Sequence, residues 1–378
     1  MRREWPGALE LDVLADETGI RALAYPGLVG RPAVGDRVLL NTTALHQGLG
    51  TGGYALVAAV PDRLPPDPAA SGGHLVKARY TPLQATVAGA DEQGSPHHDV
   101  LRDADTVAGM PVVVADLHSA LPAVIAGVFA EAEAGRGGAA PPRPRAAGSA
   151  GGPGGDGGPG GGARRPRVAY VMQDGGALPA WFSRTAAGLR EAGWLAGTVT
   201  TGQSFGGDLE AVTLHTGLLA ARHVLAADVA VVAQGPGNLG TGTRWGFSGV
   251  AAGEAVNAAA VLAGRPVASL RVSDADPRPR HRGVSHHSLT AYGRVALAAA
   301  DVVVPSLPGG FGAAVAAAAG PLGARHRLVR VAVDGLAEAL RGCPVPLSTM
   351  GRGLDEDLAY FLAAAAAGRH AARLLTAR

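Results

Sequence analysis

The sequence contains very few lysines, cysteines and aromatic residues, and each of these shortages limits what the protein can be. Lys77 is the single lysine in 378 residues, and arginine supplies the rest of the 33 basic side chains. Because Lys77 lies between Val76 and Ala78 and not in a G-K-[ST] sequence, the phosphate-binding lysine of a Walker A loop is excluded. The single cysteine, Cys343, excludes an internal disulfide, a cysteine-based zinc site and an Fe–S cluster. Aromatic residues make up only 4% of the chain, so the core must be built from Ala, Val and Leu.

A strong net charge and long apolar runs are also missing. The net charge of +2 argues against a general binder of polyanions, and the shortage of lysine and aromatic residues argues against a nucleic-acid partner. No run of about 18 apolar residues is free of charges, Pro and Gly. The first residues, Met1–Val13, carry charges of both signs and do not resemble a signal peptide. These features predict a soluble, cytoplasmic protein with no membrane partner.

Glycine, in contrast, is abundant, with 57 residues, and it gathers in one segment. Residues 136–162 contain 12 Gly and 5 Pro in 27 positions. Such a segment cannot bury enough apolar surface to offset the entropy lost on ordering it. We therefore predict that residues 132–166 form a disordered Gly/Pro-rich linker.

The part before this linker contains two kinds of pattern. In residues 1–60, four short alternating runs are separated by turn residues, which predicts a small N-terminal β-barrel. Residues 75–131 include the apolar strand Met110–Ala115 and the helix Leu121–Glu133, a pattern typical of α/β structure. This α/β segment belongs either with the barrel or with the C-terminal domain, and the pattern leaves both open.

After the linker, apolar strands alternate regularly with helices. This alternation predicts that residues 167–378 form a Rossmann-like α/β domain, with a mostly parallel sheet and helices on both faces. The six expected strands are Arg167–Met172, Gly197–Thr201, Asp228–Gln234, Pro266–Val272, Asp301–Leu307 and Leu328–Val333.

Polar residues and glycines gather in the loops that follow these strands. The carboxyl ends of parallel strands meet at one edge of a sheet, where ligands bind, so we expect a functional pocket there. One such loop, Gly235–Gly240, has the spacing G-x-G-x-x-G. The next helix begins too late for a typical dinucleotide site, so we favour a loop that cradles an anion, with packing alone as the alternative. Its expected contact residues are Gly235, Gly237, Gly240, Thr241 and Thr243.

The densest polar loop, Ser273–His287, contains two carboxylates, three arginines and three histidines. Arginine can hold a carboxylate or phosphate in bidentate fashion. We therefore expect the following side chains to bind an anion, with a solvated basic turn as the alternative: Arg278, Arg280 and Arg282. Arg280 and Arg282 alternate along the chain, so they should face one side with His281 opposite.

The same loop ends in paired histidines. Ser285 is a plausible N-cap, which places His286 and His287 in the first turn of a helix, where the rings stay neutral. A neutral imidazole serves as a general base or as a metal ligand. Simple capping and hydrogen bonding is the alternative role. A divalent metal would take its ligands from His286, His287, Asp274 and Asp276.

Two further carboxylates lie on or next to neighbouring loops of the predicted sheet edge. Asp174 and Asp208 are the expected assisting groups in catalysis by the histidines. Another motif predicts a different enzyme class, a serine hydrolase. The segment Gly202-Gln-Ser-Phe-Gly206 matches the nucleophile elbow G-x-S-x-G. A serine hydrolase would then use Ser204, but the strand before it is polar and no HGGG-like oxyanion loop is present.

Four segments together resemble an uncharacterised bacterial family, found in actinobacteria and Firmicutes and known only as a domain of unknown function. They are Gln173–Pro179, Gly202–Val212, Gly235–Gly249 and Arg271–His287. The resemblance implies no activity.

From the residues themselves we predict an enzyme that acts on a small anionic molecule, phosphorylated or not. A serine hydrolase through Ser204 and a non-enzymatic ligand-sensing or assembly module are the alternatives. A homo-oligomer is a further partner state that the sequence allows.

Overall fold

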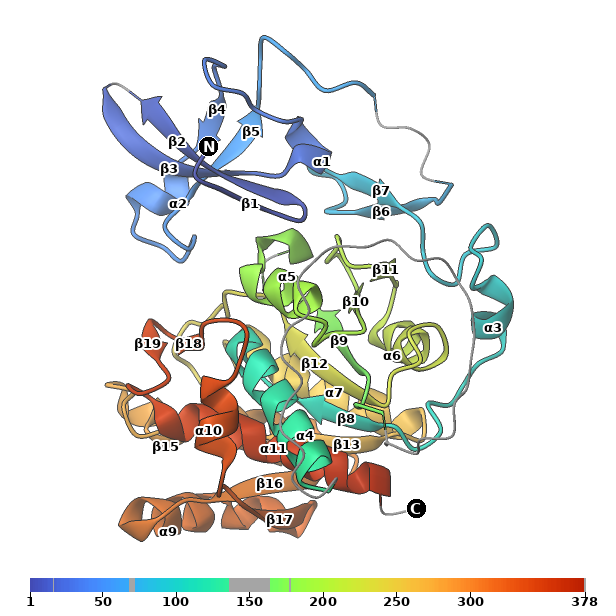
Figure 1. Ribbon diagram of the computed structural model, residues 1–378, viewed down its shortest axis with the longest axis vertical. Helices are drawn as coiled ribbons and strands as arrows, with labels where there is room; N and C mark the ends of the chain where they lie inside the picture. The colour runs from blue at the N-terminus through green and yellow to red at the C-terminus, as the bar shows by residue number, and fades with distance from the viewer. Residues whose placement is uncertain (16, 68–71, 136–163, 177, 377–378) are drawn as a thin grey trace.

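The computed structural model describes residues 1–15, 17–67, 72–135, 164–176 and 178–376 (Figure 1). Most of the predicted linker, residues 136–163, lies outside the described residues. Its first residues, 132–134, form the last turn of helix α4 (Leu121–Ala134).

An eight-stranded parallel sheet forms the centre of the molecule (Figure 1). Its order is β11-β10-β9-β12-β8-β13-β16-β17, and every pairing is parallel. The central strands are almost entirely buried, which explains their continuous apolar sequences. The strands are β8 (Pro111–Val114), β9 (Val168–Gln173), β10 (Gly197–Thr200), β11 (Leu209–Glu210), β12 (Val229–Gln234), β13 (Arg265–Ser269), β16 (Asp301–Ser306) and β17 (Arg327–Ala332).

Helices cover both faces of this sheet, as predicted. One face packs mainly against α4, α5 (Arg184–Glu191), α10 (Leu336–Arg341) and α11 (Leu358–Thr376). The other packs mainly against α6 (Leu214–His223), α7 (Ala251–Val261) and α9 (Gly309–Ala319), with α8 (His286–Thr290) and the π-helical turn Ala291–Val295 at its edge. Strand β8 lies in the middle of the sheet, so residues 111–134 are part of this domain.

The low aromatic content fits the way two of these helices pack. Helices α4 and α11 approach so closely that a Cβ built on Gly127 would lie 1.9 Å from the backbone oxygen of Ala365. On the opposite helix, a Cβ on Gly368 would lie 1.9 Å from the oxygen of Val124. Only glycine fits at these two crossings, and alanine-rich surfaces fill the space around them.

The N-terminal strands form an open mixed sheet, and the predicted β-barrel is wrong. The order is β1-β2-β3-β5-β4, with a parallel pair between β3 and β5 and no pairing between the edge strands β1 and β4. Closure would need hydrogen bonds between those edges. Instead, the two faces of this sheet are covered separately. Apolar residues from the segments that connect its strands cover one face, and Trp181 and Phe182 of the α/β domain cover the other. The elements are β1 (Arg3–Trp5), β2 (Ala8–Ala15), β3 (Thr18–Ala24), α1 (Pro26–Val29), β4 (Leu39–Asn41), α2 (Thr43–His46) and β5 (Ala55–Ala59).

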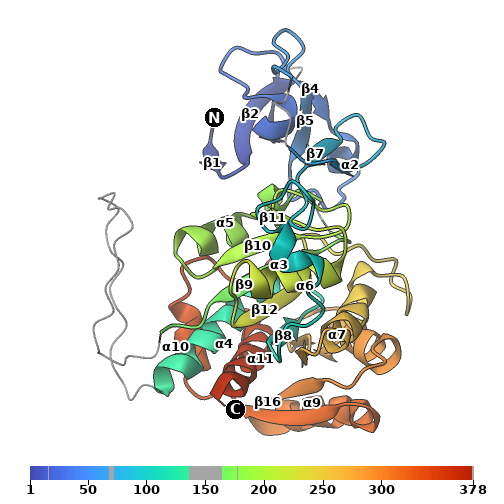
Figure 2. The ribbon, with the colours of Figure 1, turned by 90° about the vertical axis from the view of Figure 1, so that its right-hand side faces the viewer.

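Aromatic residues connect this sheet to the α/β domain, and Figure 2 shows the sheet next to α5 and β11. The indole Nε1 of Trp5 donates to the backbone oxygen of Trp181 at 2.6 Å, and Phe182 packs edge-on against Tyr54. A cleft of about 1260 Å³ lies along this junction, between residues 3–7 and helix α5.

A second connection runs through the hairpin of β6 (Leu75–Lys77) and β7 (Ala85–Val87), followed by α3 (His98–Arg102). The buried Lys77 Nζ donates to the backbone oxygens of Ser204 (3.0 Å) and Ala211 (2.9 Å) and lies 3.7 Å from the Glu210 carboxylate. Within the described part of the chain, no helix is long and apolar enough to cross a membrane.

Candidate functional site

The strand order creates a switch point at the carboxyl edge of the sheet, between β8 and β12. These strands are neighbours, but the chain leaves β8 through α4 on one face towards β9, and leaves β12 through α7 on the other face towards β13. The loops after the two strands therefore diverge. Such a switch point is where open α/β sheets bind ligands. Asp116 follows β8, and Gln234 ends β12.

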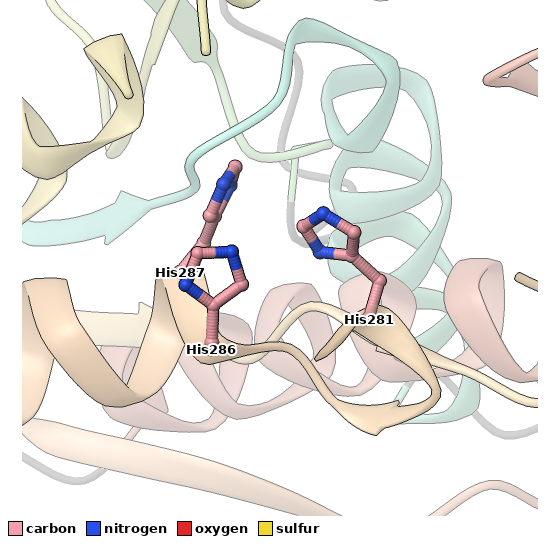
Figure 3. A group of neighbouring side chains, drawn as sticks. All are labelled: His281, His286 and His287. Carbon is pink, nitrogen blue, oxygen red and sulfur yellow. The ribbon is translucent and has the colours of Figure 1, made fainter. Parts of the chain in front are cut away.

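Three histidines meet beside this switch point (Figure 3). His281 comes from the short 3₁₀ helix Pro279–His281, and His286 and His287 open helix α8. One ring nitrogen of each lies within 4.8 Å of one ring nitrogen of both others. The local cause is the N-cap predicted from the sequence: Ser285 accepts a hydrogen bond from the backbone N–H of His287 at 3.2 Å.

A buried carboxylate orients one of these rings. Asp116 Oδ2 lies 3.1 Å from Nδ1 of His287 and 3.8 Å from the Arg271 guanidinium. Burial raises the pKa of Asp116, but the hydrogen bond from His287 and the charge of Arg271 outweigh it, so the net shift is downward. Nη1 of Arg271 also lies 3.3 Å from this Nδ1. The contact with Asp116 is shorter, and an ionised carboxylate can only accept, so we assign the proton of His287 to Nδ1, which leaves Nε2 as the atom with a lone pair.

The other two rings are also set by their surroundings. His281 Nδ1 shares a hydrogen bond of 2.8 Å with Ser285 Oγ, and burial together with Arg271 lowers the pKa of His281 to about 3. Burial, followed by the charge of His287, lowers the pKa of His286. Its Nε2 is buried and has no hydrogen-bond partner among the described residues.

The Gly-rich loop after β12 supplies a wall of the site. Phe247 stacks face to face on His287, with ring centroids 3.7 Å apart and an angle of 3° between the planes. The loop closes on itself through a bridge between Gly240 and Phe247 and a hydrogen bond of 2.7 Å from Thr241 N to Gly246 O. The hydroxyls of Thr241 and Thr243 hydrogen-bond to each other and to Gly246, so they hold the loop in shape.

The glycines and arginines predicted to hold an anion lie around this loop. A Cβ built on Gly242 would be 3.7 Å from Nη2 of Arg280, so the exposed guanidinium of Arg280 lies beside the loop. Arg282 is exposed as well. Gly235 is buried at the end of β12, and Gly237, with a φ of +90°, and Gly240 are exposed.

Two amides near this switch point have atoms without partners among the described residues. Gln234 Nε2 donates to the backbone oxygen of Asp116 at 2.8 Å, which leaves Gln234 Oε1 buried and unpaired among the described residues. The buried Nδ2 of Asn238 is also unpaired there. A Cβ on Gly249 would lie 3.1 Å from Asp116 Cβ and 3.2 Å from Asn238 Nδ2, so this amide lies close to the carboxylate.

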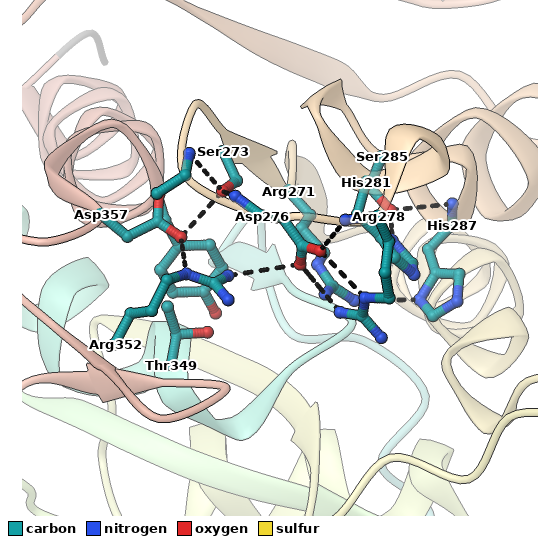
Figure 4. A network of polar contacts seen from close by, with 12 residues as sticks. Arg271, Ser273, Asp276, Arg278, His281, Ser285, His287, Thr349, Arg352 and Asp357 are labelled. Carbon is teal, nitrogen blue, oxygen red and sulfur yellow. Dashed lines mark hydrogen bonds and ion pairs between the residues drawn. The ribbon is translucent and has the colours of Figure 1, made fainter.

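A network of ion pairs fixes the histidine-bearing loop from behind (Figure 4). The fully buried carboxylate of Asp276 accepts from Arg278 at 2.9 and 2.8 Å and from Arg352 at 3.3 Å, and it lies 3.6 Å from Arg271. Asp357, just before α11, accepts from Arg352 at 2.9 Å and from a loop serine. The short hairpin of β18 (Ser348–Thr349) and β19 (Arg352–Gly353) and the pair β14 (Val272–Ser273) and β15 (Gly283–Val284) complete this support.

With this geometry in hand, the chain can be compared with known proteins. Residues 21–138 and 161–368 match the model of a family described as "Protein of unknown function (DUF3866)". The chain belongs to the DUF3866 family. This confirms the predicted resemblance to a domain of unknown function. A comparison with curated proteins finds no match.

In this DUF3866 protein, neither of the two carboxylates predicted as metal ligands belongs to the histidine cluster. Asp274 is exposed, and Asp276 is committed to its arginines. Asp276 also pairs with the guanidinium of Arg278. We therefore infer that Arg278 stabilises the loop and does not bind the anion. Burial raises the pKa of Asp276, but the hydrogen bonds and charge of Arg278 hold it far below the usual range of a carboxyl.

The predicted assisting carboxylates are bound beside β9 and β10 of the DUF3866 sheet. Asp174 Oδ2 accepts from the backbone N–H of Gln203 at 3.0 Å. Asp208 accepts from Arg190 at 2.6 Å and from the backbone N–H of Thr198 at 2.7 Å. These bonds attach both carboxylates to the region of β10 and not to the histidines.

The serine expected in the nucleophile elbow is completely buried. Ser204 is 0% exposed, and its Oγ has no hydrogen-bond partner among the described residues. A nucleophilic serine needs a histidine base within hydrogen-bond reach and an open approach. Neither surrounds Ser204 in this structure.

Four residues of the site were not predicted in their roles: Asp116, Phe247, Arg271 and His281. Asp116 directly follows the apolar run Met110–Ala115, so the rule that ligands bind beyond strand ends could have found it. His281 was expected to point away, because the chain around it was taken as extended. The 3₁₀ turn instead directs it inward and leaves Arg280 exposed.

Proposed function

We propose that the protein is an enzyme that acts on a small anionic molecule bound at the switch point between β8 and β12. The observation that carries this proposal is the convergence of three imidazole rings at a switch point of the sheet, one of them oriented by the ionised Asp116. Convergent polar groups with shifted pKa values in a crevice are typical of catalytic sites.

The chemistry supported by this arrangement is the activation of a water molecule or a substrate hydroxyl. His287 presents Nε2 because Asp116 holds its Nδ1 proton. A neutral imidazole in this state accepts a proton or binds a metal ion, and both lead to an oxygen nucleophile at neutral pH. Phe247 covers one face of the ring and keeps water from that side. Hydrolysis is therefore the reaction class that we favour.

The anion is expected to lie between Arg280 and the loop after β12. Arg280 is exposed, lies beside Gly242, and is near enough to affect the pKa of His286. Guanidinium groups bind carboxylate and phosphate in a planar, bidentate way that lysine does not reproduce. The unpaired Oε1 of Gln234 and Nδ2 of Asn238 offer an acceptor and a donor to the uncharged part of the same molecule.

A thermal-shift screen of phosphorylated and carboxylate compounds tests this proposal. A compound present at about 100 times its Kd adds about 2.7 kcal/mol to the free energy of unfolding, which raises the Tm measurably. We expect Arg280→Lys to lose the shift without changing the Tm of the free protein. Arg330→Lys, at an exposed site on β17, is the matched control and should keep the shift. If no anion raises the Tm of the wild type, or if Arg280→Lys responds fully, the proposal is wrong.

A further inference from the structure

The three histidines are arranged as ligands of one ion. We propose that His281, His286 and His287 hold a divalent transition metal, Zn²⁺ by preference, through one ring nitrogen each. The ring nitrogens, one from each residue, lie within 4.8 Å of one another. In a tetrahedral site with Zn–N distances of about 2.0–2.1 Å, ligand nitrogens are about 3.3 Å apart, so small side-chain rotations complete the contact. This goes beyond the proposed function, because metal binding is measured without any substrate.

The outer hydrogen bonds match those of a metal centre. Histidine ligands usually donate their second N–H to a carboxylate, a carbonyl or a similar acceptor, which fixes the ring and its tautomer. Here Asp116 takes this position behind His287 at 3.1 Å, and Ser285 takes it behind His281 at 2.8 Å. Both hydrogen bonds use Nδ1, so His281 and His287 each have Nε2 available for the metal. Metal binding through Nε2 requires the tautomer of His281 in which Nδ1 carries the proton and donates to Ser285.

The third ring supplies the independent observation. His286 Nε2 is buried and has no hydrogen-bond partner among the described residues. If the cluster served only for packing, this atom would lose its hydrogen bond to water and gain nothing in return. A metal ion that binds Nε2 of His286 together with the other two rings removes this unpaired atom.

The donor set decides which metals fit. Three imidazoles without a carboxylate favour Zn²⁺, Co²⁺, Ni²⁺ or Cu²⁺ over Mg²⁺ and Ca²⁺, which prefer oxygen. Three protein ligands also leave one position open, which is typical of catalytic zinc rather than structural zinc. The open position suits an anion, because the positive charge of Arg280 acts on His286 while the charge of Arg271 is already balanced by Asp116 and Asp276.

The first measurement uses the full-length wild-type protein. The chain is stripped with a chelator, dialysed, and then titrated with Zn²⁺ while heat or a competing zinc indicator is followed. We expect one Zn²⁺ per chain, and we expect Co²⁺ to give the strong visible absorption of a tetrahedral nitrogen-ligated site. If the wild type binds neither ion stoichiometrically, the inference is wrong whatever the variants do.

The second measurement identifies the ligands. Asp116→Asn removes the carboxylate that orients His287 and should weaken Zn²⁺ binding by roughly 10–100-fold. His286→Ala removes a ligand and should weaken Zn²⁺ binding by more than this. His215→Ala, at an exposed histidine in the first turn of α6, is the matched control and should bind as the wild type does. Zn²⁺ should also raise the Tm of the wild type and the control, but not that of His286→Ala. Wild-type Zn²⁺ affinity in His286→Ala would overturn the assignment.

The failure of this inference can be told apart from failure of the proposed function. The anion screen is run on the stripped protein and again with one equivalent of Zn²⁺. If the protein binds Zn²⁺ but no anion raises its Tm, the metal site is supported and the proposed anion site is wrong. If anions raise the Tm of stripped protein that binds no Zn²⁺, the anion site is supported and the metal site is wrong.

Discussion

Phe247 and His287 lie face to face, with their ring centroids 3.7 Å apart and their planes 3° from parallel. The first residue comes from the loop after β12 and the second from the start of α8, so this contact joins the two loops that build the site. An aromatic ring on one face of His287 also limits its rotation. The contact therefore serves both the stability of the loops and the orientation of the imidazole.

Replacing Phe247 with Leu keeps an apolar side chain but removes the stacking. Aromatic pairs contribute about 0.5–1.5 kcal/mol beyond the burial of their area. We expect Phe247→Leu to lower the free energy of unfolding by about 1 kcal/mol and to weaken Zn²⁺ binding several-fold. Phe182→Leu, which removes an aromatic contact with Tyr54 at the N-terminal sheet, is the control. It should lower the Tm and leave the Zn²⁺ titration unchanged. Equal Zn²⁺ affinity in both variants would contradict the role given to the stacking.

Asp276 is the centre of the ion-pair network, and its loss should be costly. Its carboxylate is 0% exposed and interacts with three arginines. Removing one partner of a buried ion pair costs about 3–5 kcal/mol, because the remaining charges are left uncompensated. We expect Asp276→Asn to lower the Tm by roughly 10 °C in a domain of this size. Asp274→Asn, two residues away and exposed, should leave the Tm unchanged in the same differential scanning calorimetry. A small effect of Asp276→Asn would show that the network adds little stability.

The parallel sheet could be predicted from the sequence because its strands are buried on both faces. A run such as Val229–Gln234 has to be apolar throughout, and that pattern is visible without knowledge of its neighbours. Strand order is different, since β8 lies between β12 and β13, which are far away in the sequence. No local pattern encodes that placement. The predicted barrel failed for the same reason, because alternating residues reveal strands but not whether edges meet.

The site could be predicted only in part. The N-cap Ser285 and the two histidines after it form a local pattern, so they were found. Asp116 is 171 residues from His287, and only the fold brings the two together. Asp276, a predicted metal ligand, pairs with Arg278, two residues away, and also with Arg352, which lies far along the chain in a C-terminal hairpin. Local spacing shows that Arg278 is near Asp276, but it cannot show that Arg352 pairs with the same carboxylate.

Lys77 should hold the β6–β7 hairpin to the α/β domain. Its side chain is 3% exposed and donates to the oxygens of Ser204 and Ala211, and the Glu210 carboxylate lies 3.7 Å away. Lys77→Met leaves both carbonyls without this donor and removes the cation beside Glu210, whose carboxylate still accepts from Thr200 Oγ1 and from the backbone N–H of Gly206. We expect a loss of about 3 kcal/mol in urea unfolding.

A double-mutant cycle separates the ion pair from the carbonyl contacts. Glu210→Gln keeps the shape of the side chain and removes the charge. If Lys77 and Glu210 interact directly, the double variant should lose less stability than the sum of the two singles, by about 1–3 kcal/mol. Strict additivity would mean that Lys77 acts only through the carbonyls.

A buried histidine outside the candidate site should make the protein sensitive to acid. His118 Nδ1 lies 3.0 Å from the hydroxyl of Tyr170, and Nε2 lies 2.7 Å from Oγ of Ser183. Tyr170 donates to the backbone oxygen of Gln234, so its hydroxyl accepts from Nδ1–H and Ser183 donates to Nε2. The ring is thus satisfied in its neutral form.

Burial lowers the pKa of His118 to about 4, against about 6.5 in an unfolded chain. Between these values the unfolded state binds more protons than the folded state, so the free energy of unfolding falls as the pH falls from 6.5 to 4. The full effect is about 3 kcal/mol, of which about 2 kcal/mol is lost by pH 5. Asparagine does not titrate, so we expect His118→Asn to respond less to pH, although it should be less stable than the wild type at pH 7.5. Between pH 7.5 and pH 5, its free energy of unfolding in urea should fall by about 2 kcal/mol less than that of the wild type. His215→Asn, at an exposed site, should follow the wild-type pH dependence. An identical pH dependence in the wild type and His118→Asn would show that His118 is not held neutral by the fold.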